Sequence, residues 1–269
     1  MNLNNTVSVM RDAAKDAGEY IFKRVGRIKR LDYKGDVKNL VTDVDKGAER
    51  IIIKLLKKSF PEYGFLAEES GLTESKSDYR WVIDPLDGTT NFAHGFPHFS
   101  VSIALEHKGK IIAGTVYDPV KDEMFYAYKG GGAYLNKKRI TVSKEKMFAK
   151  SLLATGFAYD IRTHAKYTAE LLVNLLLNAQ ELRRAGSAAL DLSYIACGRF
   201  EGYWERGLSP WDTAAGFIIV EEAGGKVTNF NNRKYDPYQK QILATNGKIH
   251  KQMLKIINNK SPKSGIHNL

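Results

Sequence analysis

The sequence has little cysteine and no long hydrophobic run. Cys197 is the single cysteine among 269 residues, so an intrachain disulfide is excluded and a reducing compartment is expected. No apolar run approaches the roughly 18 residues that a transmembrane helix needs, and the first residues lack the apolar segment of a signal peptide. The chain also has no internal repeat, Pro-rich linker or low-complexity tract. We therefore expect a cytoplasmic protein that does not enter the membrane.

Length and composition are those of a globular protein. Hydrophobic residues make up 43% and charged residues 26% of the chain, which is ordinary for a folded domain. A single hydrophobic core stops growing at roughly 250–300 residues. We expect one unit with an N-terminal α+β half over about residues 1–150 and a C-terminal α/β half over about 151–258, followed by a flexible tail over 259–269.

Positive charge is in excess, and it is concentrated near the C-terminus. The formal net charge is +11, and residues 226–269 hold nine Lys or Arg against one acidic residue. Such an excess makes anionic partners plausible, and nucleic-acid binding is one alternative function. No aromatic stacking platform is interleaved with these lysines, so that alternative depends on charge alone. The lysines are Lys248, Lys251, Lys255, Lys260 and Lys263.

Hydrophobic periodicity predicts helices and strands in alternating blocks. Apolar residues at three- and four-residue steps indicate helices, whereas short apolar or alternating runs indicate strands. The run from residue 65 to 128 resembles an antiparallel meander. This block pattern favours sheets sandwiched between helical layers. The predicted helices cover 3–25, 48–56, 163–178, 187–197, 210–223 and 247–258, and the predicted strands cover 65–67, 81–83, 101–105, 111–117, 124–128, 201–204, 226–229 and 242–245.

Side chains that could bind a ligand are most closely spaced directly after the apolar run 81–83. Asp84 and Asp87 follow it, three positions apart, and on a straight strand their side chains would point to opposite faces. Pro85 fixes its own φ and makes the preceding residue extended, so a bend here can bring both carboxylates together. Gly88 permits a close backbone approach, and Thr89-Thr90 offer hydroxyl and N–H groups. Converging carboxylates beside such donors suit a hard cation that holds a phosphate.

Two further acidic positions support this interpretation. Glu68 follows the predicted strand 65–67, and Asp212 lies in the first turn of the helix that begins at Pro210. Two of these acidic sites also have a purely structural explanation. The segment Asp84–Gly88 reads Asp-x-x-Asp-Gly, which is good turn sequence, and an acidic residue such as Asp212 in the first turn of a helix complements the helix dipole.

The sequence resembles the inositol monophosphatase family of Mg²⁺-dependent, lithium-sensitive phosphatases, and in particular its bacterial branch. The resemblance covers nearly the whole chain and includes four motifs in order. It implies an α+β fold, the five-layer α-β-α-β-α sandwich of the inositol monophosphatase and fructose-1,6-bisphosphatase type, and usually a homodimer. The motifs are Leu40–Asp45, Glu68–Ser70, Asp84–Asn91 and Trp211–Gly216, with Arg183–Asp191 indicating the bacterial branch.

The resemblance also implies roles for individual residues, with two or three Mg²⁺ ions in each site. The following assignments come from the family's motifs alone. The metal ligands would be Glu68, Asp84, the Leu86 carbonyl, Thr89, Asp87 and Asp212; water activation would involve Asp45, Glu68 and Thr89; the phosphate would lie on Gly88, Thr89 and Thr90; the inositol ring would contact Gly186, Ser187, Ala188 and Glu205; and Lys34 would lie near the site.

The substrate stays open at this point. Inositol monophosphate is our first choice, and the NADP(H) 2′-phosphate and fructose 1,6-bisphosphate are alternatives on the same site. The segment 43–47 resembles the nucleophile motif of haloacid-dehalogenase phosphatases, but that chemistry needs an Asp at the end of a buried strand. We predict instead that Thr42 or Asp43 caps the following helix. His98 and Cys197 are interpreted as structural.

Overall fold

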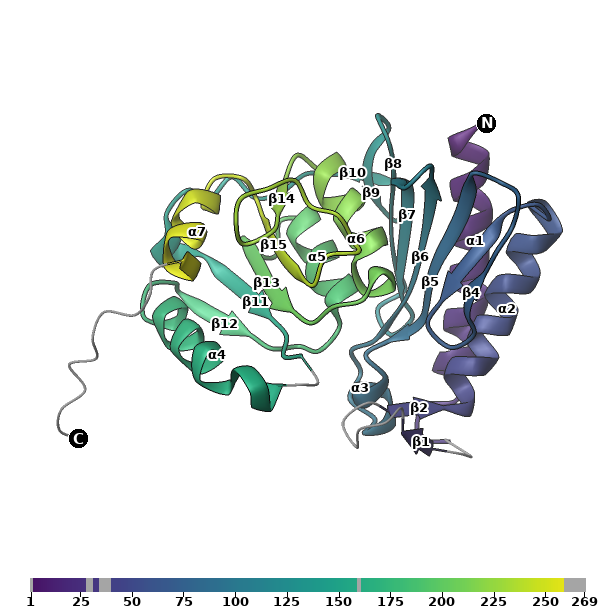
Figure 1. Ribbon diagram of the computed structural model, residues 1–269, viewed down its shortest axis with the longest axis horizontal. Coiled ribbons are helices and arrows are strands. Elements are labelled where there is room, and N and C mark those ends of the chain that lie inside the picture. The colour runs from purple at the N-terminus through teal and green to yellow at the C-terminus, as the bar shows by residue number, and fades with distance from the viewer. Residues whose placement is uncertain (1, 28–30, 34–39, 159–160, 259–269) are drawn as a thin grey trace.

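The computed structural model describes residues 2–27, 31–33, 40–158 and 161–258 (Figure 1). Lys34 and the predicted tail 259–269 lie outside these residues. The elements are α1 (Leu3–Phe22), β1 (Leu31–Tyr33), β2 (Leu40–Thr42), α2 (Asp43–Ser59), β3 (Gly64–Ala67), β4 (Gly71–Thr73), β5 (Tyr79–Asp87), α3 (Thr89–Ala93), β6 (Ser100–His107), β7 (Lys110–Asp118), β8 (Glu123–Tyr128), β9 (Gly132–Leu135), β10 (Lys138–Ile140), the 3₁₀ turn η1 (Phe148–Lys150), β11 (Leu152–Thr155), α4 (Ile161–Leu176), β12 (Glu181–Arg183), α5 (Ala188–Ala196), β13 (Gly202–Arg206), α6 (Pro210–Glu222), β14 (Lys226–Thr228), β15 (Gln241–Thr245) and α7 (His250–Asn258).

An eight-stranded sheet forms one side of the molecule, in the order β10-β9-β8-β7-β6-β5-β3-β4. From β5 to β10 neighbouring strands are antiparallel, which confirms most of the predicted meander. The exception is β3, which runs parallel to β5. The α1 and α2 helices cover the outer face of this sheet. The apolar stripe of α1 makes this contact through buried residues that include Val7, Met10, Ala14, Ala17 and Ile21.

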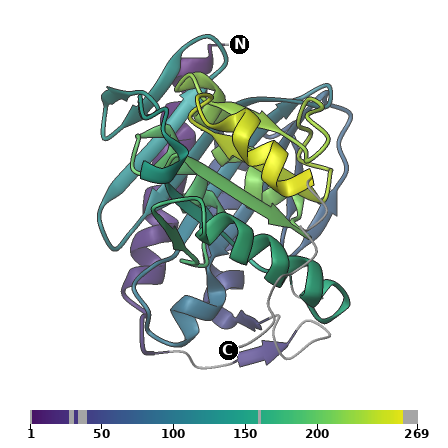
Figure 2. The ribbon, with the colours of Figure 1, turned by 90° about the vertical axis from the view of Figure 1, so that its left-hand side faces the viewer.

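A five-stranded sheet forms the other side, in the order β12-β11-β13-β15-β14. Its first three strands are parallel, and β15 is antiparallel to both of its neighbours. The α4 and α7 helices cover its outer face and contact each other (Figure 2). A separate apolar cluster fills this contact, and it includes Leu171, Leu175, Trp204, Met253 and Ile257.

The α5 and α6 helices form the middle layer between the two sheets. All residues of α5 are buried, as is the run 213–220 of α6, and a helix that is apolar all round belongs in such a core. Backbones approach closely here. A Cβ atom at Gly114 of β7 would lie 2.6 Å from the carbonyl oxygen of Ala215 in α6. The middle layer is therefore fixed tightly against the large sheet.

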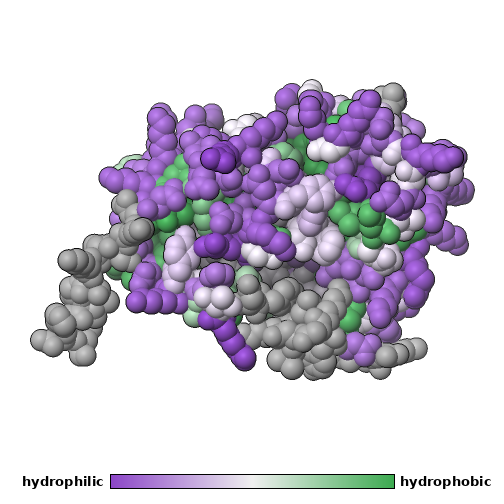
Figure 3. Space-filling view, viewed as in Figure 1, coloured by the Kyte–Doolittle hydropathy of each residue, from purple (hydrophilic) through white to green (hydrophobic). Residues whose placement is uncertain are grey.

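The layers run α1/α2, large sheet, α5/α6, small sheet, α4/α7, so the expected five-layer α-β-α-β-α fold is confirmed. Hydrophilic residues cover most of the face seen in Figure 3, as expected for outer helices that turn their apolar stripes inward. In the part of the chain that the structure describes, no helix is both long and apolar enough to cross a membrane.

Several element boundaries differ from the sequence predictions. The first helix ends at Phe22, so Val25 lies beyond it, and the last begins at His250 rather than at residue 247. The sequence patterns do not predict the short strands β1, β2, β4, β9, β10, β11 and β12. Most have three residues, which is too short for a period-2 pattern to appear. Their existence depends on pairing with distant partners, as when β12 joins β11.

Candidate active site

Acidic residues from both sides of the molecule converge on one cavity of about 120 Å³. The cavity lies where β3 and β5 end, beside the first turns of α5 and α6 and one end of β13. Every site residue expected from the sequence lines this cavity, with two exceptions. Asp45 lies behind Thr89, and Lys34 is outside the described residues. The lining includes Glu68, Asp84, Leu86, Asp87, Gly88, Thr89, Thr90, Gly186, Ser187, Ala188, Glu205 and Asp212.

A bend in β5 brings its two aspartates to the same cavity. Asp84 is paired with Ser102 of β6 and Asp87 with Ser100, so three steps along β5 match two steps along β6. This register shift is a β-bulge, which re-aims side chains that strand alternation would separate. Asp84 Oδ1 accepts a hydrogen bond of 2.9 Å from the Leu86 N–H and so secures the bend. The sequence predicted the bend from Pro85.

Asp87 is held by the start of α5. Its Oδ2 atom accepts hydrogen bonds from the Ser187 hydroxyl at 2.6 Å and from the Ala189 N–H at 2.8 Å. Burial nevertheless raises the pKa of Asp87 to about 6, although both hydrogen bonds oppose the shift. The Ser187 hydroxyl is thus committed to orienting an acidic side chain rather than open to the cavity.

Asp212 has two tasks at the start of α6. It occupies the third helical position, and its Oδ2 atom accepts a hydrogen bond of 2.6 Å from the Ser209 N–H, which completes a capping box. The same side chain lines the cavity. Burial raises the pKa of Asp212, and the charge of Glu68 raises it further. Asp212 therefore both caps α6 and contributes a carboxylate to the cavity.

The cavity contains too little positive charge to balance its carboxylates. Burial raises the pKa of Asp84 well above its ordinary value, and the charges of Glu68 and Asp87 add to the effect. Arg184 is the only basic side chain on the described lining. Buried carboxylates that repel one another suit a divalent cation with oxygen ligands. Within the described ranges, no group of three or more His, Cys, Asp or Glu is already arranged to hold a metal ion.

Asp45 and Thr89 form a hydrogen-bonded pair beside the acidic cluster. The Thr89 hydroxyl lies 3.0 Å from Asp45 Oδ1 and also 3.0 Å from the Leu86 carbonyl oxygen. Asp45 Oδ2 accepts from the Thr42 N–H at 2.8 Å, and Thr42 is the N-cap of α2. The predicted helix cap is therefore correct. Asp43 is the first residue of α2 and not on the cavity lining, so the haloacid-dehalogenase alternative is not supported.

Gly88 allows the backbone to turn between β5 and α3. Its φ of +97° lies in the region that side chains disfavour. A Cβ atom there would also lie 3.0 Å from the His98 carbonyl oxygen and 3.3 Å from that of Gly186. The turn brings Thr89 and Thr90, the first residues of α3, onto the cavity lining, and the first N–H groups of a helix have no acceptor within the helix.

Glu205 lies within β13, which corrects the prediction that it follows that strand. The strand runs from Gly202 to Arg206, two residues later than predicted, because its pairing with β15 continues as far as Gln241. The Tyr203 hydroxyl donates to Glu205 Oε2, and burial raises the pKa of Glu205 to about 7. A Cβ atom at Gly156 would overlap the Glu205 carboxylate, so a glycine leaves room for this side chain.

Sequence reasoning assigned no role to several other lining residues. Asp191, one turn into α5, is buried, and its Oδ1 atom has no hydrogen-bond partner in the structure. Its signals in the sequence are an acidic residue inside an apolar helix and a place at the end of the motif Arg183–Asp191. Arg184 and Gly156 also line the cavity, and both lie near Glu205. Their approach depends on how distant segments pack, which local patterns do not reveal.

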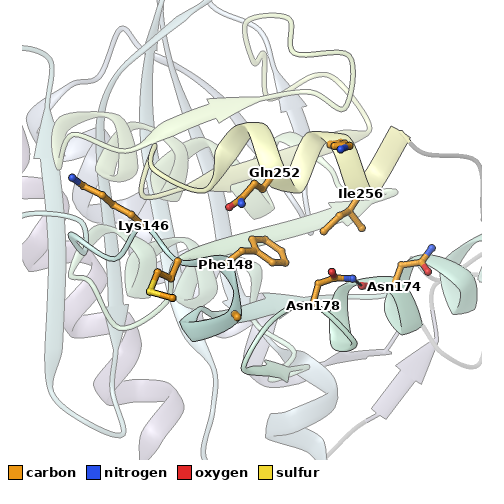
Figure 4. Close-up of a pocket in the computed structure, with 9 residues that line it drawn as sticks. Lys146, Phe148, Asn174, Asn178, Gln252 and Ile256 are labelled. Carbon is orange, nitrogen blue, oxygen red and sulfur yellow. Dashed lines mark hydrogen bonds between the residues drawn. The ribbon is translucent and has the colours of Figure 1, made fainter.

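A larger cavity lies elsewhere and has different chemistry. It measures about 730 Å³ and lies between η1, α4 and α7, where Phe148, Asn174, Gln252 and Ile256 point toward it (Figure 4). Its described lining contains lysine and amide side chains but no carboxylate. It therefore offers no acidic cluster for a metal.

Comparison with known proteins identifies relatives across the whole chain. A model of the inositol monophosphatase family matches residues 2–261. An inositol-1-monophosphatase from Synechocystis sp. is 44% identical and covers 94% of this chain and 88% of its own. The Nus factor SuhB of Pseudomonas aeruginosa is 43% identical, with 94% and 95% covered.

Solved structures agree with these sequence matches. The suhB protein of Bartonella henselae superimposes with a TM-score of 0.91 at 40% identity, covering 96% of this chain and 100% of its own. The inositol monophosphatase from Anabaena superimposes with a TM-score of 0.86 at 41% identity, covering 96% of each chain.

The raised pKa of Glu205 predicts a pH dependence of stability. A carboxyl whose pKa is about 7 in the folded protein and roughly 4.3 when unfolded stabilises the fold fully below the lower value, and this contribution is lost as pH rises through the higher one. Between pH 5 and 8, the unfolding free energy of the metal-free wild type should therefore fall by roughly 1–3 kcal/mol relative to Glu205→Gln. Urea unfolding at several pH values measures the difference. Glu62→Gln, at an exposed position, is the control. If the difference in unfolding free energy between the wild type and Glu205→Gln did not change with pH, the raised pKa of Glu205 would be contradicted.

Proposed function

The chain belongs to the inositol monophosphatase family of phosphoric monoester hydrolases, and we propose that it hydrolyses inositol monophosphate in a Mg²⁺-dependent reaction. One observation carries this proposal. Four carboxylates, from Glu68, Asp84, Asp87 and Asp212, line the same small cavity as the Thr89 hydroxyl. Hard cations prefer such oxygen ligands, and paired cations promote in-line displacement at phosphorus.

The acidic residues divide into two overlapping ligand sets. Glu68, Asp84, the Leu86 carbonyl and Thr89 would hold the first Mg²⁺, while Asp84, Asp87 and Asp212 would hold the second. When bound, Mg²⁺ lowers the pKa of a coordinated water and offsets charge on the phosphate. From the same family resemblance we propose two or three ions, inhibition by lithium and a homodimer.

The Thr89 hydroxyl is proposed to orient the attacking water. A hydroxyl has one proton to donate, and the charged Asp45 carboxylate is a stronger acceptor than the Leu86 carbonyl. Donation to Asp45 therefore leaves the Leu86 oxygen available to a cation and turns the Thr89 oxygen toward a water as an acceptor. Glu68, which lines the same cavity, would accept the second hydrogen of that water.

The remaining residues of the cavity suit the substrate. The N–H groups of Gly88, Thr89 and Thr90 begin α3, and the positive end of a helix favours a phosphate. Gly186, Ala188 and Glu205 line the same cavity, and an inositol ring would contact them. Because the Ser187 hydroxyl already donates to Asp87, we propose that this side chain supports a metal ligand and that only its backbone faces the ring.

Other substrates and one other class of function compete with this proposal. NADP(H) 2′-phosphate and fructose 1,6-bisphosphate would use the same cavity, and phosphate release from a panel of all three separates them. Nucleic-acid binding is the non-enzymatic alternative. Lys248, Lys251 and Lys255 are exposed, and the last two are four residues apart on α7, whereas Lys260 and Lys263 lie outside the described residues. Binding of RNA that weakens steeply with salt, without Mg²⁺-dependent phosphate release, would favour that alternative.

Asp212→Asn tests the metal requirement. The amide oxygen can still accept from the Ser209 N–H, so the helix cap and the fold should survive while a charged ligand is lost. We expect at least a tenfold loss of kcat at moderate Mg²⁺, since even residues that only support metal ligands are worth roughly 10–100-fold, together with a higher Mg²⁺ requirement. Asp236→Asn is the matched control, because this exposed Asp also accepts a backbone N–H, from Tyr238 at 3.0 Å. Full activity of Asp212→Asn at low Mg²⁺ would contradict the proposed ligand set.

Asp45 and Thr89 should act as one unit. Asp45→Asn and Thr89→Ala are each expected to lower kcat by roughly 10²–10⁴, the usual worth of positioned proton transfer. The double variant should lose little more than the worse single variant, because both changes disable the same step. Asn2→Ala is the control: it removes the side-chain cap of α1, at a cost of about 1 kcal/mol of stability, and leaves every hydrogen bond of Asp45 and Thr89 in place. Fully additive losses in a double-mutant cycle would show that the two residues act separately.

A further inference from the structure

The large cavity between η1, α4 and α7 is separate from the acidic cavity and is not used by the proposed reaction. The two cavities have no described lining residue in common. The volume of about 730 Å³ lies within the range of roughly 300–1,000 Å³ that is typical of ligand sites. Phe148 on its lining is only 7% exposed and packs in the same apolar cluster as Leu171 and Leu175. The core of the protein therefore supports this cavity from below.

Carboxamide side chains point toward this cavity from both helices (Figure 4). Asn174 lies on α4, Asn178 follows the end of that helix, and Gln252 lies on α7. Asn178 donates one hydrogen bond, to the Asn174 carbonyl oxygen at 2.7 Å. The Asn174 and Gln252 side chains make no hydrogen bond to the part of the chain that the structure describes. Because each carboxamide is both a donor and an acceptor, these side chains can pair with the amide groups of a ligand.

The spacing of these side chains matches that of an extended peptide. Residues four apart on an α-helix lie on the same face and are separated by about 6 Å along the axis. Peptide groups two residues apart in an extended chain repeat at roughly 6.6 Å. Gln252 and Ile256 are four residues apart within α7. Asn178 lies one turn beyond Asn174, as its hydrogen bond to the Asn174 carbonyl oxygen shows. Both walls of the cavity therefore repeat at nearly the period of an extended chain.

The charge of this cavity favours an acidic ligand. Lys146 and Lys255 are exposed lining residues, and the described lining contains no carboxylate. Glu145 precedes the first of these lysines, but its Oε1 atom accepts from the backbone N–H groups of Lys146 at 2.8 Å and of Met147 at 2.7 Å. That carboxylate is therefore committed to its own backbone. The Met147 side chain adds apolar surface, since this residue lines the cavity and is 54% exposed.

We propose that this cavity, which we call the amide groove, binds an acidic peptide segment of another protein in an extended conformation. Asn174, Asn178 and Gln252 would pair with its peptide groups, and Phe148 and Ile256 would contact its alternate apolar side chains. The two lysines of the lining would pair with its carboxylates. Main-chain hydrogen bonds then supply affinity, and contacts with alternate side chains supply specificity, as in other modes of extended-peptide recognition. This role is independent of the proposed phosphatase reaction.

A peptide suits the groove better than a nucleic acid does. Single-stranded nucleic acids bind where exposed aromatic rings stack on bases, and the one aromatic ring on the described lining belongs to the buried Phe148. Phosphates would pair with the lysines but would leave the carboxamides of Asn174 and Gln252 without a role. A peptide uses the carboxamides, the apolar surface and the lysines together.

Calorimetric titration of the full chain with acetyl-Asp-Leu-Asp-Leu-Asp-amide tests the proposal. Asn174→Leu keeps the size of the side chain and the backbone carbonyl but removes a donor and an acceptor. It should weaken binding roughly tenfold or more, the worth of two hydrogen bonds. Lys255→Gln should weaken binding several-fold and reduce its dependence on salt.

Matched variants separate the groove from general effects. Asn5→Leu makes the same exchange at an exposed position of α1, on the other side of the molecule. Lys251→Gln removes an exposed charge from α7 outside the described lining. Both variants should bind the peptide as the wild type does.

Analogues of the peptide test its recognition without changing the protein. Methylation of its leucine N–H groups should weaken binding at least tenfold, and so should replacement of aspartate by asparagine. Octanoate, which carries a charge and an apolar chain without peptide groups, should not compete.

Several results would overturn the amide groove. These are absence of peptide binding to the wild type, equal binding of the methylated peptide, equal losses in Asn174→Leu and Asn5→Leu, or displacement of the peptide by octanoate. Tighter binding of an oligouridylate that displaces the peptide would assign the groove to nucleic acid instead.

Discussion

The crowding of carboxylates in a small cavity is the constraint on which the rest of the structure depends. Burial and mutual repulsion raise the pKa values of Asp84, Asp87 and Asp212, so the arrangement is unfavourable unless the surrounding backbone enforces it. Each side chain is accordingly fixed by a backbone N–H: that of Leu86, of Ala189 or of Ser209. The folded protein thus holds in place a negatively charged cavity whose charge a cation would neutralise.

The middle helical layer makes this enforcement possible. Both α5 and α6 begin at the cavity, so the positive ends of their dipoles face the carboxylates and partly offset the repulsion. The α5 and α6 helices cannot move away from the cavity, because they are buried between two sheets. Close contacts fix them further, since a Cβ atom at Gly216 of α6 would lie 2.6 Å from the Leu192 Cβ atom of α5. The apolar core therefore sets the geometry of the polar site.

The sequence predicted the parts of the site that are encoded locally. The bend after Pro85, the cap at Thr42 and the helix that starts at Pro210 each follow from a few neighbouring residues, and each is observed. The five-layer fold was expected from a family resemblance rather than from periodicity. Strands of three residues such as β12 escaped prediction because distant partners define them. Arg206 and Tyr167 are almost forty positions apart, so the contact between this guanidinium and this ring is evident only in the folded chain.

The central claim is that this cavity binds divalent cations between β3, β5 and α6. Anomalous diffraction from crystals grown with Mn²⁺, an oxygen-seeking substitute for Mg²⁺, tests that claim most directly. We predict at least two anomalous peaks in the acidic cavity, both within coordination distance of Asp84, and loss of the peak beside α6 in crystals of Asp212→Asn. Crystals with Mn²⁺ bound elsewhere on the surface and none in the cavity would contradict the account.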